Sequence, residues 1–99
     1  MKIVTLCGSL KFQNEMMKIT QDMALEGYCI LTPVYLTSNV INITDEQLLK
    51  LKEERLKRIE LSDAILVVNV NNYIGESTNF EIEYAKKLDK EIMYYIEQK

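Results

Sequence analysis

One glutamate and two short glycine-containing segments are the residues of this chain best suited to chemistry. Glu81 follows the segment Gly-Glu-Ser-Thr at 75–78, and Cys-Gly-Ser occupies 7–9 after the apolar run at 3–6. A carboxylate beside a pocket can attack or stabilise a cationic sugar centre, as the glutamates of glycosidic-bond enzymes do. The glycines let the backbone approach a ligand, and a helix that begins after each segment would offer unpaired N–H groups to an anion.

Each of these features also has a structural explanation that the sequence leaves open. Thr78 and Glu81 form a T-x-x-E capping box, in which the two side chains only satisfy backbone donors of a first helical turn. A tight turn followed by a capping serine or threonine likewise explains the segments at 7–9 and 75–78. Spacing alone therefore permits a catalytic Glu81 without requiring it.

The composition narrows the chemistry further. The chain has 99 residues, two cysteines and no histidine, and its net charge is -3. Without histidine, Ser-His and Cys-His nucleophile pairs are excluded, and a general acid or base must be a carboxylate, lysine, tyrosine or thiol. No spacing typical of a zinc site is present, so we expect neither a metal nor a cofactor. The two cysteines are expected as small buried side chains rather than as a disulfide.

Charge and hydropathy limit the partners as well. A negatively charged chain lacks the basic face that a nucleic-acid polymer requires. No apolar run approaches the roughly 18 residues that span a bilayer, and the first residues lack the longer apolar stretch of a signal peptide. The phosphate-binding motifs G-x-x-x-x-G-K-[ST] and G-x-G-x-x-G are absent. We therefore expect a cytoplasmic protein that binds neither a nucleic-acid polymer nor a membrane.

The order of apolar patterns indicates one small α/β domain over residues 1–99. Strands are expected at 2–7, 28–32, 64–70 and 91–96, the third being apolar on both faces as in the middle of a parallel sheet. Right-handed crossovers make this a doubly wound sheet, whose ligand lies beyond the carboxyl ends of the strands. Helices are expected at 10–26, at 44–61 behind a capping box, and at 78–88.

The second helix and the segment before it carry further expectations. The charged run at 52–58 is expected mainly as a solvated helix face. The least periodic stretch, 33–43, is too apolar for a bare loop, so it covers either the pocket or a second subunit. The apolar residues expected to face inward from the second helix are Leu48, Leu51, Leu56 and Ile59.

Three segments together resemble the nucleoside 2-deoxyribosyltransferase superfamily and its 2'-deoxynucleoside 5'-phosphate N-hydrolase branch. They are Leu-Cys-Gly-Ser at 6–9, Asp-Ala-Ile-Leu-Val-Val-Asn at 63–69, and Gly-Glu-Ser-Thr-Asn-Phe-Glu-Ile-Glu-Tyr-Ala at 75–85. The resemblance is strongest to small members with a Cys-Gly-Ser start and a Gly-Glu-Ser-Thr loop, and it covers nearly the whole chain. It implies a flavodoxin-like, Rossmann-like three-layer sandwich with a short parallel sheet of about four strands.

The resemblance also implies roles for individual residues. In the superfamily, the glutamate of the E-[LI]-x-x-A helix attacks C1' of a deoxyriboside, and Glu81 occupies that position. The loop after the first strand and the residues ahead of the glutamate hold the 5' end of the ligand or its phosphate. The implied substrate-binding residues are Cys7, Gly8, Ser9, Asn69, Gly75, Glu76, Ser77 and Thr78.

Some family features have no counterpart here. The family's tyrosine near the end of the first strand corresponds to Thr5 or Leu6, and its aspartate on the helix before the third strand corresponds to Arg55. Only Glu76 or Tyr35 is then left to protonate a leaving base. The family's fifth strand and the helix before it are also missing from the 99 residues.

Two hypotheses on function follow. The first is an enzyme that binds a nucleotide or (deoxy)nucleoside 5'-monophosphate and cleaves or exchanges its N-glycosidic bond through Glu81. The second is a non-catalytic nucleotide-binding module that has lost the acid. We also expect a homodimer or higher homo-oligomer, because a four-stranded sheet has an uncovered apolar face and little stability to spare. The residues expected in that contact, or else in a lid over the chain's own pocket, are Val34, Tyr35, Leu36, Val40 and Ile41.

Overall fold

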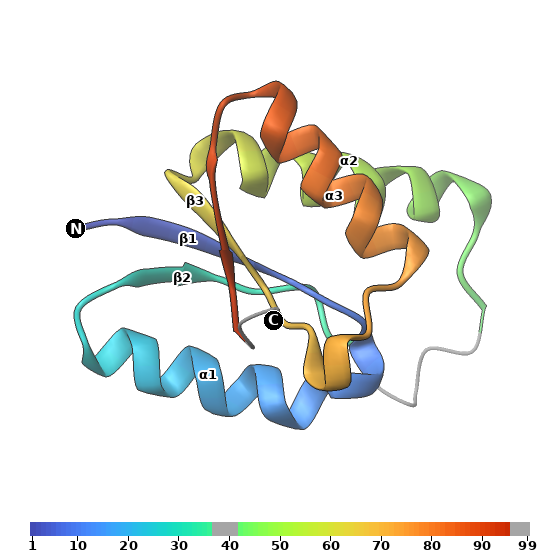
Figure 1. Cartoon of the computed structure of the whole chain (residues 1–99). Coiled ribbons are helices and arrows are strands. Elements are labelled where there is room, and N and C mark those ends of the chain that lie inside the picture. The colour runs from blue at the N-terminus through green and yellow to red at the C-terminus, as the bar shows by residue number, and fades with distance from the viewer. Residues whose placement is uncertain (37–41, 96–99) are drawn as a thin grey trace.

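A four-stranded parallel sheet lies between two helical layers in the computed structural model, which describes residues 1–36 and 42–95 (Figure 1). The strands are β1 (Ile3–Cys7), β2 (Cys29–Leu31), β3 (Ala64–Val67) and β4 (Glu91–Tyr94), in the order β2-β1-β3-β4. The helices are α1 (Gln13–Leu25), α2 (Asp45–Leu61) and α3 (Glu76–Lys87). The expected α/β fold with a short parallel sheet is confirmed.

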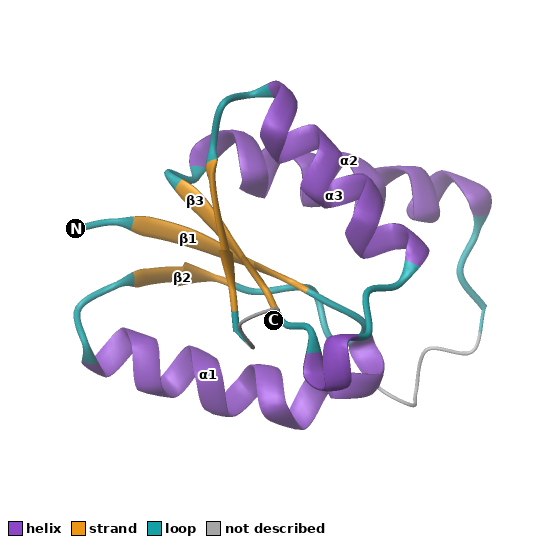
Figure 2. Ribbon diagram, viewed as in Figure 1, coloured by secondary structure: helices purple, strands orange, loops and turns teal. Residues whose placement is uncertain are grey.

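The helix α1 covers one face of the sheet, and α2 and α3 cover the other (Figure 2). Successive side chains of a strand point to opposite faces, so β1 and β3 contribute to both cores. The core under α1 contains Val4, Leu6, Met16, Ile19, Ala64, Leu66 and Val68. The core under α2 and α3 contains Cys7, Ile59, Ile65, Val67, Ile82 and Ala85.

The register of β1 and β3 brings their carboxyl ends to the same level. The paired residues run from Val4 opposite Ala64 to Cys7 opposite Val67. The loops that leave these two strands therefore start side by side, which is the arrangement that a ligand site at the switch in strand order requires.

Several element boundaries differ from the expected ones. The third strand ends at Val67 rather than at 70, because the chain turns through Val70–Asn72, where Asn71 and Asn72 take φ angles of 55° and 62°. Asparagine tolerates this left-handed conformation better than most residues. The first helix opens with a 3₁₀ turn, Leu10–Phe12, before α1 begins. The expected end of the last strand, at 96, lies outside the described residues.

The helix α2 starts as expected but packs less than expected. Its capping box is complete, since the Thr44 hydroxyl accepts from the Gln47 N–H at 3.1 Å and the Gln47 side chain accepts from the Thr44 N–H at 3.0 Å. Leu48 is 51% exposed, so the prediction that it faces inward is wrong, whereas Ile59 is fully buried. Leu51 and Leu56 are half-buried. The reason is that the N-terminal half of α2 extends past the sheet (Figure 1).

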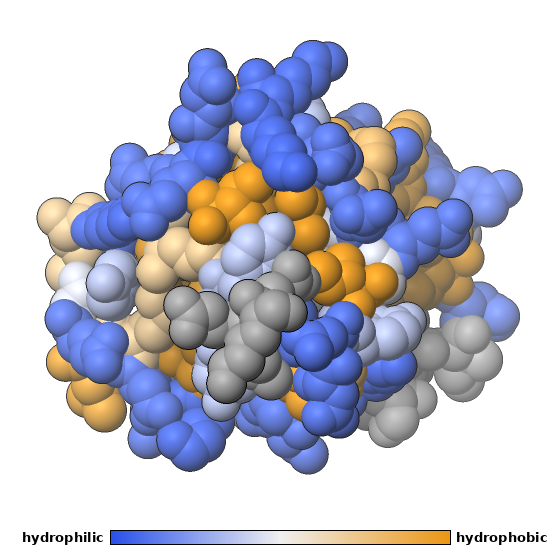
Figure 3. Space-filling view, viewed as in Figure 1, coloured by the Kyte–Doolittle hydropathy of each residue, from blue (hydrophilic) through white to orange (hydrophobic). Residues whose placement is uncertain are grey.

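The face seen in Figure 3 has hydrophilic side chains over the helices, with hydrophobic side chains gathered between the two helical layers. Here β4 forms an edge of the sheet, since it pairs only with β3 among the described strands. None of the described helices is both long and apolar enough to cross a membrane.

Candidate active site

Two adjoining cavities open where β1 and β3 end. The inner cavity, of about 160 Å³, reaches from the end of β1 to α2 and the first turns of α3. The outer cavity, of about 230 Å³, lies between the loop after β1 and the N-terminus of α3. Gly8, Leu10 and Ser77 line both of them. This location, between β1 and β3, is the switch in strand order at which ligands bind in open α/β sheets.

Most of the residues singled out in the sequence lie around these two cavities. Glu81 lines the inner cavity together with Gly8 and Ser77. Cys7 and Asn69 line neither cavity, because both are fully buried. The predicted residues around the outer cavity are Gly8, Ser9, Gly75, Glu76, Ser77 and Thr78.

The loop after β1 depends on the absence of a side chain at Gly8. A Cβ atom there would lie 3.2 Å from the Val68 Cβ and 3.3 Å from the Val68 carbonyl oxygen. Gly8 therefore makes room for the chain that leaves β3, in addition to leaving the cavities open. Ser9 follows as the cap of the turn Leu10–Phe12, and its Oγ accepts from the Lys11 N–H at 3.4 Å.

Aromatic contacts join the loop after β3 to the turn Leu10–Phe12. The Tyr73 ring packs edge-on against Phe12, with ring centroids 5.8 Å apart. The Lys11 ammonium lies 3.4 Å from the centroid of the same ring. Since Tyr73 lines the outer cavity, these contacts fix one wall of it and bring a positive charge close to it.

The helix α3 begins two residues earlier than expected. Gly75 is its N-cap, no side chain caps it, and Thr78 is already the third helical residue, 2% exposed. The interpretation of Thr78 and Glu81 as a capping box is therefore wrong. The N–H groups of the first turn, at residues 76–78, have no acceptor within the helix. They are available to an anion in the outer cavity, whose wall these residues form.

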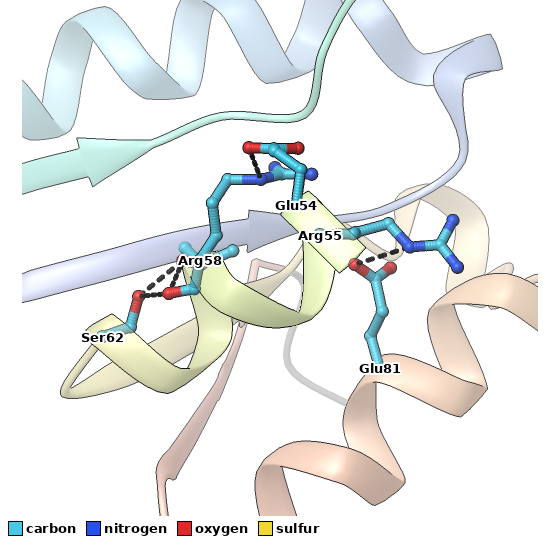
Figure 4. Close-up of polar contacts among 6 residues, drawn as sticks. Glu54, Arg55, Arg58, Ser62 and Glu81 are labelled. Atoms are coloured by element: carbon cyan, nitrogen blue, oxygen red, sulfur yellow. Dashed lines mark hydrogen bonds and ion pairs between the residues drawn. The ribbon is translucent and has the colours of Figure 1, made fainter. Parts of the chain in front are cut away.

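Glu81 is buried against two arginines. Its side chain reaches from α3 towards α2, where the Arg55 Nε lies 3.8 Å from the Glu81 Oε2 (Figure 4). Burial, which leaves the residue 5% exposed, raises the pKa of Glu81 to about 7. The guanidinium groups of Arg55 and Arg58 and a hydrogen bond from the Cys7 thiol oppose this rise. The carboxylate is therefore divided between its protonated and ionised forms at neutral pH.

Cys7 supports Glu81 from inside the core. Burial raises the pKa of the Cys7 thiol well above its usual range, and the nearby Glu81 charge adds to the rise. The thiol therefore stays protonated and donates to the Glu81 carboxylate. Cys7 and Cys29 are both free thiols, as expected, although Cys29 is only half-buried.

The sequence pattern did not indicate three charged residues of the inner cavity, all from the run at 52–58. Glu54, Arg55 and Arg58 line the cavity rather than a solvated face. Arg58 is 8% exposed, and its Nε lies 2.8 Å from the Glu54 Oε2. The signal was their spacing, because positions three, four and seven residues after Leu51 belong to the inward stripe of a helix.

Of the residues at the departures from the family pattern, Arg55 lines the inner cavity, whereas Thr5 and Leu6 line neither cavity. The Thr5 hydroxyl donates to the Arg58 carbonyl oxygen at 3.1 Å and so ties β1 to α2, while Leu6 packs under α1. The Tyr35 hydroxyl is buried without a hydrogen-bond partner among the described residues, and burial raises its pKa. Of the two proton donors considered for a leaving base, only Glu76 lines the site.

Comparison with known proteins gives matches in structure only, since no family model and no curated protein matches the sequence. A 2-desoxiribosyltransferase from Leishmania mexicana superposes with a TM-score of 0.71 and 18% identity, over 96% of this chain and 64% of that enzyme. A CMP N-glycosidase from Clostridium botulinum superposes with a TM-score of 0.63 and 17% identity, over 94% of this chain and 70% of that one. The chain thus spans less than two thirds of the length of the first enzyme.

Both neighbours agree with the resemblance that the sequence motifs indicated. At these identities the likeness concerns the fold alone. The chain has the flavodoxin-like fold that a 2-desoxiribosyltransferase and a CMP N-glycosidase share.

Proposed function

We propose that this chain binds a nucleoside 5'-monophosphate across the two cavities and cleaves or transfers its N-glycosidic bond, with Glu81 as the nucleophile. The observation that carries the proposal is a buried carboxylate, with a pKa of about 7, on the wall of the inner cavity. The transferase and the glycosidase of the same fold support N-glycosidic chemistry in general.

The outer cavity suits the phosphate. The free N–H groups of the first turn of α3, the hydroxyl groups of Ser9 and Ser77, and the nearby Lys11 ammonium are all donors to an anion. Glu76, on the same wall, opposes part of this attraction. Because Ser77 and Glu81 are four residues apart, they share one face of α3. A ligand with its phosphate at the N-terminus of α3 would bring its sugar to Glu81 and its base into the inner cavity.

The reaction would proceed in two steps. The ionised Glu81 oxygen attacks C1', the bond from C1' to the base nitrogen breaks, and its electron pair leaves with the base, which takes up a proton. The sugar is then bound to Glu81 as an ester. Attack of water at C1' releases the sugar phosphate, and attack of a second base releases a new nucleotide, in both cases with Glu81 as the leaving carboxylate.

The test is the release of free base from deoxynucleoside and nucleoside monophosphates, measured by chromatography. We expect Glu81→Gln to lower the rate by at least about 10³-fold, as the loss of a nucleophile does in other enzymes. Glu83→Gln is the matched control, because Glu83 is an exposed residue of the same helix. If Glu81→Gln retained the rate of the unchanged protein, Glu81 would not be the nucleophile.

A non-catalytic nucleotide-binding module is the second candidate. It is favoured by Arg55, which lies beside Glu81 where the family has an aspartate, because a guanidinium cannot supply a proton. Under this alternative, calorimetry detects binding of a monophosphate while chromatography detects no free base. Release of base that requires Glu81 would exclude it.

We further propose that the protein assembles as a homo-oligomer. Val34 and Leu36 are each 44% exposed, and Leu48 and Leu49, on the projecting half of α2, are 51% and 56% exposed. Val40 and Ile41, expected in the same contact, lie outside the described residues. Light scattering at micromolar concentration should give a multiple of the 11.6 kDa chain mass. A mass of 11.6 kDa would favour the alternative, a lid over the chain's own pocket.

A further inference from the structure

The wall that α2 contributes to the inner cavity carries an ion pair whose buried polar atoms are not all hydrogen-bonded. The Arg58 Nε lies 2.8 Å from the Glu54 Oε2, and both residues line the cavity (Figure 4). The Glu54 Oε1 and the Arg58 Nη1 are buried, and neither has a hydrogen-bond partner among the described residues. Arg58 as a whole is only 8% exposed.

Buried polar atoms are normally hydrogen-bonded, because leaving one unpaired costs the loss of its hydration. The Arg58 Nε, although 2.8 Å from the Glu54 Oε2, is a third buried atom of this pair without a hydrogen-bond partner among the described residues. A ligand in the inner cavity that bonds the Glu54 Oε1 and the Arg58 Nη1 would compensate these two atoms for their lost hydration, whereas an apolar ligand would not.

The chemistry of the two atoms restricts that ligand. The Glu54 carboxylate can only accept a hydrogen bond, and the Arg58 guanidinium can only donate one. The ligand must therefore offer an N–H or O–H group next to an acceptor. A phosphate is excluded, because it has no donor for Glu54 and would meet a second negative charge there.

The rest of the cavity favours a flat, largely apolar ring with this donor and acceptor on one edge. A nucleobase has such an edge on the side away from its glycosidic nitrogen. With the sugar at Glu81, that edge would be directed towards α2. The apolar residues that line the inner cavity are Leu10, Pro33, Val34, Leu36 and Leu51.

We propose that Glu54 and Arg58 read the hydrogen-bonding edge of the base, Glu54 by accepting from its N–H and Arg58 by donating to its neighbouring acceptor. This inference rests on the proposed function and assigns its base specificity. The site takes bases that present a donor beside an acceptor, and it discriminates against bases from which the donor is missing. Neither residue is required to act on the reacting bond.

The experiment compares, by calorimetry, each natural monophosphate with an analogue that lacks the donor. The pairs are AMP with purine riboside 5'-monophosphate, CMP with its 2-pyrimidinone analogue, UMP with 3-methyl-UMP and GMP with 1-methyl-GMP, and ribose 5-phosphate serves as the ligand without a base. For the nucleotide that binds best, we expect removal of the donor to weaken binding by about 10- to 100-fold. Glu54→Gln should abolish this preference, since an amide no longer offers a charged acceptor held by Arg58.

Two further variants keep the experiment decisive. Glu53→Gln is the matched control, because Glu53 is the exposed neighbour on α2, and it should keep the full preference. Arg58→Lys keeps the charge but removes Nη1, and it should weaken the natural nucleotide and its analogue alike, because both keep the acceptor to which Arg58 donates. Thermal melting of each variant verifies that it is folded.

The outcomes separate this inference from the proposed function. If the nucleotide, its analogue and ribose 5-phosphate bind equally well, reading of the base by Glu54 and Arg58 is overturned while the nucleotide site stands. If Glu54→Gln keeps the preference and only slows base release, the inference is also overturned, and Glu54 acts in the reaction instead. If no monophosphate and no ribose 5-phosphate binds, both proposals are overturned.

Discussion

The two faces of the sheet bury different kinds of side chain. The face under α1 encloses a cluster made only of aliphatic and methionine side chains. The face under α2 and α3 encloses an apolar cluster as well, but a layer of polar and ionisable groups lies beside it. The buried polar residues of β1, of α2 with its C-cap, and of α3 are Thr5, Arg58, Ser62, Thr78 and Glu81.

Because of this difference, the face under α1 mainly contributes stability, whereas the face under α2 and α3 holds the ionisable groups. Apolar burial under α1 stabilises the folded chain, by roughly 25 cal/mol for each Å² removed from water. Under α2 and α3, burial instead disfavours the ionised form of Glu81, whose pKa rises to about 7 from an ordinary value of 4.5. Such a rise corresponds to about 3 kcal/mol of lost stability above pH 7. A binding or catalytic site can use a buried ionisable group even though that group lowers the stability of the folded protein without ligand.

The largest expected effect on stability comes from the face under α1. Leu6→Ala should lower the free energy of unfolding by about 2–5 kcal/mol, because it leaves a cavity in a fully buried cluster. Thr5→Val, at the neighbouring position on the other face, should cost only about 1 kcal/mol, since the Ser62 hydroxyl still donates to the Arg58 carbonyl at 2.7 Å. Urea denaturation measures both. Equal losses would contradict the difference between the faces.

Glu81→Gln should stabilise the protein at alkaline pH. Because the pKa of Glu81 is raised in the folded state, the folded protein binds more protons than the unfolded chain between pH 4.5 and about 7, and its stability falls as pH rises through that window. Removal of the charge should therefore raise the free energy of unfolding by up to about 3 kcal/mol at pH 8, and by almost nothing at pH 4. Urea denaturation at the two pH values tests this, with Glu83→Gln as the control that shows no such difference.

The same titration should appear in the reaction. Under the proposed mechanism only the ionised carboxylate attacks, so the rate of base release should rise about tenfold per pH unit below the pKa of Glu81 and level off above about 7. Cys7→Ala removes the hydrogen bond that favours the ionised form, so the midpoint of the pH profile should move to a higher pH. An unchanged midpoint would show that Cys7 does not influence the ionisation of Glu81.

The smallest expected effect concerns the phosphate. One helix N-terminus favours an anion by roughly 0.3–1 kcal/mol, so a 5'-monophosphate should bind a few-fold more tightly than the matching nucleoside, and more so at low salt. Calorimetry at two salt concentrations measures the difference. Glu76→Gln should enlarge it, because it removes a negative charge from the wall of the outer cavity. Equal affinities for nucleotide and nucleoside would exclude the outer cavity as a phosphate site.

The sequence by itself determined the features that depend on neighbours a few residues apart. The strands follow from short apolar runs, and the start of α2 follows from the reciprocal bonds of Thr44 and Gln47, so both could be read locally. The parallel order of the sheet follows from the alternation of these elements and the handedness of their connections. The motifs around Gly8 and Glu81 were recognisable for the same reason, because each is contiguous in the chain.

Only the tertiary structure decided what those residues do. Local sequence allowed α3 to begin at Thr78, but the turn after β3 lets it begin at Glu76. Glu81 is therefore not a capping residue, and its side chain lines the inner cavity. The charged run on α2 has the composition of a solvated face, but packing of α2 against β1 and α3 buries Arg58. The pKa of Glu81 is set by burial and by arginines from another helix. Burial and charge depend on groups that only folding brings together, so no local pattern encodes them.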